Sequence, residues 1–92
     1  MVVAAPVEVD PVSGPAFDEA LAAVPADTDV RVDCSAVAFM DSTGLRSLVV
    51  ARNRHVAAGG SLLVTAPSAA ARRVLELGGL EGLIDEVGAP GS

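Results

Sequence analysis

The stretch VRVDCSAVAFMDSTGLRSLVVARNRHVAAGGSLLVT, from Val30 to Thr65, contains a strand pattern, a helix pattern and a second strand pattern in that order. Residues 30–33 are a short run typical of a strand, and residues 61–65 form a second one. Between them, the helical spacing over 43–58 predicts one apolar side made by Leu45, Leu48, Val49 and Val56. Gly59 and Gly60 then supply a helix C-cap. This order predicts two parallel strands joined by a right-handed crossover.

The segments on either side extend the same alternation. Residues 2–5 and 7–9 are short strand candidates separated by Pro6, which suits an edge strand. A helix is predicted to begin near Pro15 and to bury Phe17, Ala20, Leu21 and Val24. A third helix follows Ser68, its expected N-cap, and ends at Gly78. Residues 80–87 predict a helical turn with room for a last strand, and 88–92 a tail, so residues 1–92 make one domain.

Composition excludes several classes of protein. The 92 residues carry a net charge of −6, the six basic residues are all Arg, and Lys, Trp and Tyr are absent. An acidic chain without stacking aromatics lacks what a nucleic-acid binder needs, so no direct nucleic-acid contact is expected. With 51% hydrophobic residues, the chain is large enough for one core but not for a deep active-site cavity as well.

The cysteine content and the hydrophobic pattern indicate the cellular compartment of the protein. The single cysteine, Cys34, cannot form an internal disulfide and follows a strand pattern, so we interpret it as an inert buried thiol in a reducing compartment. The N-terminus has no basic flank typical of a signal peptide. No apolar run approaches the roughly 20 residues that span a bilayer. We therefore expect a soluble, cytoplasmic protein without membrane insertion.

The heptapeptide FMDSTGL, residues 39–45, places Ser42 where a strand ends and a helix begins. Open parallel sheets often have their sites at such points. Free N–H groups and the helix dipole favour negative charge there, so a phosphate on Ser42 would be accommodated, although Asp41 is a like charge beside it. The competing interpretation is structural. Asp, Ser and Thr before a helix are ordinary N-cap residues, and the heptapeptide alone leaves both interpretations open.

A catalytic role for Ser42 lacks the necessary neighbours. The nucleophile elbow of α/β-hydrolases needs glycine two positions before and after the serine, and Met40 occupies the first of these places. The only histidine, His55, lies 13 residues along the same helix, about 20 Å away. We interpret His55 as a solvent-exposed cation near the helix C-terminus. No metal cluster or cofactor loop is visible, so we expect neither an enzyme nor a bound metal.

Residues 30–84 resemble the STAS superfamily, in particular the bacterial anti-sigma factor antagonists. The similarity rests on DCSAVAFMDSTGL, AGGSLLV and RRVLELGGLEGLI, with a weaker match in VEVDPVSGPAF that places Glu8, Val9 and Asp10 in family positions. The resemblance implies an α/β, STAS-like fold, with a four- to five-stranded mixed sheet and helices mainly on one face.

The resemblance also implies a function. Such antagonists bind an anti-sigma factor that is itself an ATP-dependent serine kinase, and thereby free the sigma factor. The kinase phosphorylates the serine that matches Ser42, the antagonist is released, and a phosphatase restores it. The chain itself needs no cofactor, because the partner kinase supplies the ATP. Thr43 is a secondary phosphorylation candidate, and the partner-binding residues implied are Asp10, Asp41, Ser42, Thr43, Gly44, Leu45 and Arg46. From helical spacing, Arg46 is expected to be exposed on the partner-facing side.

Departures from the family pattern keep other functions open. Val7 stands where the family usually has glycine, Pro6 interrupts a short first strand, and no segment matches the family's C-terminal helix. A second hypothesis is therefore a constitutive STAS binding module of a transporter or signalling assembly, in which Ser42 only caps the helix. A third, a small hydrolase using Ser42, is disfavoured because a base is missing.

Overall fold

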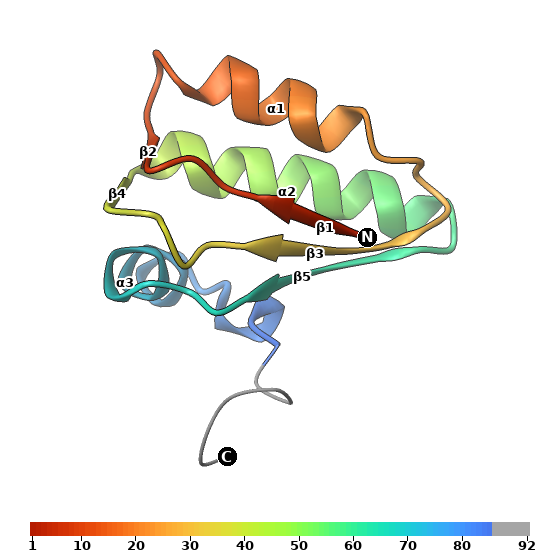
Figure 1. The fold of residues 1–92 in the computed structure, drawn as a ribbon. Helices are drawn as coiled ribbons and strands as arrows, with labels where there is room; N and C mark the ends of the chain where they lie inside the picture. Colours follow the sequence, from red (N-terminus) through yellow and green to blue (C-terminus); the bar gives the residue numbers. More distant parts are fainter. Residues whose placement is uncertain (86–92) are drawn as a thin grey trace.

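The computed structural model describes residues 1–85 as an α/β fold (Figure 1). The strands are β1 (Val2–Ala4), β2 (Glu8–Val9), β3 (Asp29–Asp33), β4 (Phe39–Met40) and β5 (Ser61–Thr65). The helices are α1 (Gly14–Ala22), α2 (Ser42–Ala57) and α3 (Ala69–Leu77), followed by the short 3-10 turn η1 (Glu81–Leu83). The predicted tail over 88–92 and the end of the predicted last segment lie outside the described residues.

The five strands divide into two sheets. One has the order β1-β3-β5 and the other pairs β2 with β4. Val32 lies between Val3 and Val64 in the larger sheet. The predicted α/β fold is confirmed, as is the parallel crossover from β3 through α2 to β5. The sheet was expected to be mixed, whereas every strand pairing within residues 1–85 is parallel.

The larger sheet has a buried side and an open side. Val30, Val32, Leu62 and Val64 alternate along β3 and β5 and are almost fully buried. On the other side Arg31 binds Asp85 in an ion pair of 3.2 Å. Helices α1 and α2 lie on the same side of the strands, with α2 packed on β5 and α1 on α2 (Figure 1). The expectation that the helices lie mainly on one face is met by these two, while α3 packs beside β4.

Helix ends follow the predicted signals in most places. The Ser68 hydroxyl accepts a hydrogen bond from the N–H of Ala71 and caps α3, as predicted. Gly59 has a φ of +86° after α2, a conformation that suits glycine. At the end of α3, however, the positive φ belongs to Gly79, and Gly78 remains right-handed. The last strand is reduced to a single bridge between Ile84 and Val64.

Three predictions about helix faces are wrong. Ala20 is exposed, because the buried side of α1 is made by Gly14, Phe17 and Leu21. Val56 is exposed, because the buried side of α2 is made by Gly44, Ser47, Leu48, Ala51 and His55. His55 is 1% exposed rather than solvated, and its Nδ1 lies 3.0 Å from the carbonyl oxygen of Thr28. The loop before β3 therefore closes over the end of α2 and covers the imidazole.

Cys34 is fully buried, as predicted. Burial raises the pKa of its thiol to about 12, and the negative charge of Asp33 adds to the effect. A thiol held neutral in this way is a poor nucleophile. Among the described residues, no helix is both long and apolar enough to cross a membrane.

Candidate functional site

The carboxyl ends of β2 and β4 bring two acidic residues that are distant in sequence to one edge. Val9 pairs with Met40 in parallel register, and the N–H of Asp41 donates to the carbonyl of Val9. Asp10 directly follows β2 and Asp41 directly follows β4, so both lie at this edge. Ser42 follows immediately as the first residue of α2. The candidate site is thus the junction between the two-stranded sheet and the N-terminus of α2.

Asp41, and not Ser42, is the N-cap of α2. One oxygen of its carboxylate accepts a hydrogen bond from the N–H of Thr43 at 2.8 Å, and its backbone is extended, as an N-cap requires. Ser42 is helical and exposed, and its hydroxyl has no hydrogen-bond partner within residues 1–85. The interpretation of Ser42 as a capping residue is therefore wrong, and its hydroxyl is left open to solvent.

The first amides of α2 are already occupied. Besides the bond from Thr43, the carbonyl oxygen of Asp41 accepts from the N–H groups of Gly44 at 3.0 Å and Leu45 at 3.4 Å. The sequence suggested that these amides would receive a phosphate on Ser42. In the structure they face Asp41 instead, so a phosphate would be favoured by the helix dipole but would find few free N–H groups.

Asp10 holds the turn that precedes α1. Its carboxylate accepts hydrogen bonds from the N–H groups of Val12 and Ser13, both at 2.9 Å, and lies 3.0 Å from the Ser13 hydroxyl. The N–H of Ser13 is the main cause that lowers the pKa of Asp10, and the Ser13 hydroxyl adds to it. Asp10 therefore stays ionised and places a fixed negative charge at the site.

Close packing fixes the start of α2. A Cβ on Gly14 would lie 2.7 Å from Cγ2 of Thr43, so α1 and α2 meet there without space for a larger residue. Gly44 is buried, and a Cβ on it would lie 2.5 Å from Cγ of Met40. Leu45 is half-buried and reaches Gly78 at the end of α3. Of the predicted site residues in this helix, Ser42 and Arg46 are the exposed ones.

Two exposed apolar residues that the sequence analysis did not assign to the site lie beside this junction. The carbonyl of Val7 accepts hydrogen bonds from the N–H groups of Ala38 and Phe39, so the two segments run side by side. Val7 is 56% exposed and Phe39 49% exposed. The alternation of β4, in which Met40 is buried and Phe39 is not, is the signal that could have identified them.

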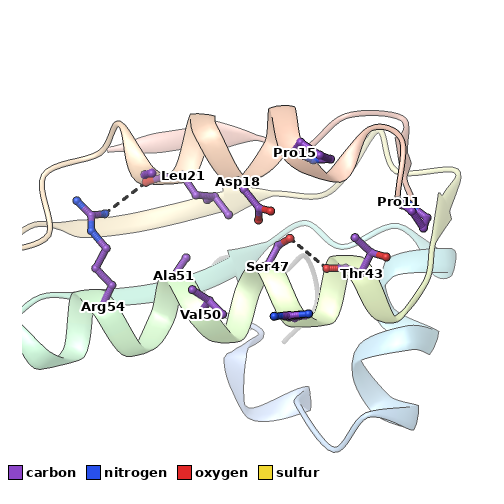
Figure 2. Close-up of a pocket in the computed structure, with 11 residues that line it drawn as sticks. Pro11, Pro15, Asp18, Leu21, Thr43, Ser47, Val50, Ala51 and Arg54 are labelled. Atoms are coloured by element: carbon purple, nitrogen blue, oxygen red, sulfur yellow. Dashed lines mark hydrogen bonds between the residues drawn. The ribbon is translucent and has the colours of Figure 1, made fainter.

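A groove of about 530 Å³ between α1 and α2 begins next to the junction. Figure 2 shows Asp18 and Leu21 of α1 on one wall and Ser47, Val50 and Arg54 of α2 on the other. The Ser47 hydroxyl donates to the carbonyl of Thr43 at 3.0 Å. No group of three or more His, Cys, Asp or Glu side chains able to hold a metal occurs in residues 1–85.

Comparisons with known proteins agree with this architecture. The family described as "Mlab, STAS domain" matches residues 1–85. A structure of the anti-sigma factor antagonist SpoIIAA in its unphosphorylated form is similar, with a TM-score of 0.73 and 22% identity over 91% of this chain and 76% of that one. An anti-sigma-factor antagonist (STAS) domain protein from Planctomyces limnophilus is also similar, with a TM-score of 0.68 and 19% identity over 90% of this chain and 77% of that one. Comparison with curated proteins gives no match.

Proposed function

This chain belongs to the STAS domain family, and from that premise we propose that it is an anti-sigma factor antagonist controlled by phosphorylation of Ser42. In the unphosphorylated form it binds an anti-sigma factor that is a serine kinase and frees the sigma factor. Phosphorylation of Ser42 ends this binding, and a phosphatase restores it. The chain itself has a binding role and no catalytic one.

The observation that carries the proposal is the state of the Ser42 hydroxyl. Asp41 caps α2, so Ser42 is exposed and its hydroxyl is not needed for folding. Thr43, the neighbouring hydroxyl residue, has its methyl group packed against Gly14 and is half-buried. Of the two neighbouring hydroxyl groups, that of Ser42 is therefore the more accessible to a kinase. The similar fold of an anti-sigma factor antagonist supports the same function.

The surface around Ser42 suits a protein partner. Val7 and Phe39 are exposed apolar residues on one side of it, and Arg46 is exposed one helical turn further along α2. An apolar contact rimmed by charged residues is the usual composition of a protein interface. Gly44 and Leu45 contribute indirectly, because their packing holds the first turn of α2 in place.

Phosphorylation would change the charge of this surface sharply. The kinase transfers the γ-phosphoryl group of ATP to the Ser42 oxygen: an O–P bond forms, the bond to ADP breaks, and the hydroxyl proton passes to a base of the kinase. The product carries about −1.5 to −2 charges at pH 7. Asp10 is ionised and the first amides already bind Asp41, so within residues 1–85 that charge is offset by the helix dipole and by Arg46, one turn further along α2. A hundredfold loss of affinity corresponds to about 2.7 kcal/mol, which a desolvated, unpaired phosphate can supply.

The test is to map the phosphate. The purified chain is incubated with ATP and an anti-sigma factor kinase that binds it, and the product is analysed by peptide mass spectrometry. We expect modification at Ser42, its loss in Ser42→Ala, and its retention in Ser35→Ala, which removes another exposed hydroxyl. Phosphate on Ser35 or Ser68, or no phosphate with a kinase that binds the chain, would contradict the proposal.

A second candidate function is a constitutive binding module of a transporter or signalling assembly. The observation that favours it is the hydrogen bonding at the start of α2, where Asp41 leaves few amides to receive a phosphate. In that case the same surface binds its partner permanently, and Ser42→Asp leaves the affinity unchanged.

A further inference from the structure

We propose that the groove between α1 and α2 is a self-association surface, in which two copies of this chain pair about a twofold axis. The groove has a volume of about 530 Å³ and a largely apolar lining that includes Leu21, Val50 and Ala51. Val50 is 60% exposed at the α2 wall of the groove. This inference goes beyond the proposed function and does not depend on it.

The two walls of the groove carry opposite charges. Arg46, Val50 and Arg54 follow one another at intervals of four residues along α2, so the two arginines are about 12 Å apart along the helix. Arg54 already reaches across the groove, where its guanidinium donates to the carbonyl of Leu21 at 3.5 Å (Figure 2). The α1 wall carries Asp18, and Glu19 is exposed next to it. In the part of the chain that the structure describes, the ion pair found is that of Arg31 with Asp85. The charged side chains that flank the groove therefore have no ion-pair partner within residues 1–85.

This arrangement favours a second copy as the occupant. A copy rotated by 180° presents its acidic α1 to the basic face of α2, and the symmetry makes the same contact a second time. A different protein would have to supply both an acidic and a basic surface in the same register. Figure 2 shows Asp18 directed into the space between the two helices.

The expected dimer is weak. The chain carries a net charge of −6, so two copies repel each other at long range. At physiological salt this repulsion is screened beyond about 8 Å, whereas contacts between adjacent charges persist. A standard interface of roughly 800 Å² per partner would take about a sixth of the 5049 Å² surface of the described residues. We therefore expect a dissociation constant on the order of 10–100 μM.

Because Thr43 and Arg46 line the groove, the dimer covers the surface next to Ser42.

The experiment is sedimentation velocity of the full chain over roughly 1–500 μM at physiological salt, a range that brackets the expected constant. One variant combines Arg46→Glu with Arg54→Glu, and another combines Asp18→Arg with Glu19→Arg. Each variant alone should dissociate at least about tenfold more readily than the wild type, because like charges then face each other. A mixture of the two should regain a dimer, since every contact is again between opposite charges. Arg73→Glu on α3 is the control: it reverses the charge of one exposed residue away from the groove, which is half the change of charge in each double variant.

Circular dichroism checks that each variant folds; the substituted side chains are all exposed. Recovery of the dimer in the mixture, with wild-type behaviour of Arg73→Glu, would establish the surface. A wild-type chain that stays monomeric up to about 500 μM would overturn the proposal. A dimer that survives both charge reversals, or a mixture that remains monomeric, would overturn it equally. None of these results bears on whether Ser42 is phosphorylated.

Discussion

Replacing Asp41 by alanine should destabilise the fold, whereas replacing Ser42 by alanine should not. The carboxylate of Asp41 is half-buried and accepts the N–H of Thr43 at 2.8 Å. The Ser42 side chain is exposed and takes no part in the cap. The two residues are adjacent and both are common capping types, so only the structure assigns the cap to one of them.

The expected size of the effect follows from two contributions. Loss of an N-cap costs about 1 kcal/mol, and loss of a negative charge at a helix N-terminus costs about 0.5 kcal/mol more. For a domain of this size, about 1.5 kcal/mol corresponds to a fall in Tm of about 6–12 °C. Asp41→Asn retains the cap and loses only the charge, so its Tm should fall by about 2–4 °C. Ser42→Ala should stay within about 0.5 kcal/mol of the wild type.

Thermal unfolding followed by circular dichroism at pH 7 measures these differences, and urea denaturation gives the free energies directly. The expected order of stability is wild type and Ser42→Ala, then Asp41→Asn, then Asp41→Ala. If Ser42→Ala lost as much stability as Asp41→Ala, the hydroxyl would belong to the cap. The assignment of Ser42 as a side chain free for modification would then be refuted.

Two further predictions concern the packing around this junction. Gly14→Ala should destabilise the fold by about 1–3 kcal/mol, because its Cβ would lie 2.7 Å from Cγ2 of Thr43. Adding Thr43→Ser removes that methyl group and should restore most of the lost stability, as measured by urea denaturation. If the second substitution restores nothing, the contact with Thr43 is not the cause of the destabilisation. Cys34 should resist a thiol reagent at pH 8 in the folded chain and react in urea, because burial raises its pKa to about 12. The Cys34 thiol ionises near its ordinary pKa of 9.0 in the unfolded chain but only near 12 in the folded one, so stability should fall as the pH rises from about 9 to about 12. If a Cys34→Ala variant loses the same stability over this range, other groups cause the loss.

Features set by local sequence could be predicted well. The crossover over residues 30–65 follows from two strand patterns around a helix that glycine ends, and the structure has it at the predicted place. Ser68 also caps α3 as predicted, since only one capping residue stands at that helix start. In these cases the sequence signals of each strand and helix end lie within a few residues of one another, although the two strands themselves pair across a long separation, Val30 with Leu62.

Features set by distant contacts could not be predicted. DST offers three capping residues in a row, and the choice of Asp41 depends on β4 pairing with β2, which keeps Asp41 extended through its bond to Val9. His55 was expected to be a solvated cation at a helix end, but it is buried, and its Nδ1 lies 3.0 Å from the carbonyl oxygen of Thr28, 27 residues earlier. The amides of α2 looked available for a phosphate for the same reason: the sequence does not show which oxygen already binds them.

The most direct test of the proposed function is the affinity of the chain for its kinase partner as a function of the state of Ser42. Isothermal titration calorimetry would compare the wild type, Ser42→Ala, Ser42→Asp and the phosphorylated protein. We predict that the wild type and Ser42→Ala bind equally well. The phosphorylated protein should bind about a hundredfold more weakly, which corresponds to a loss of about 2.7 kcal/mol. Ser42→Asp should also weaken binding. Equal affinities for all four would show that Ser42 does not control the interaction, and would leave a constitutive binding module as the function of this surface.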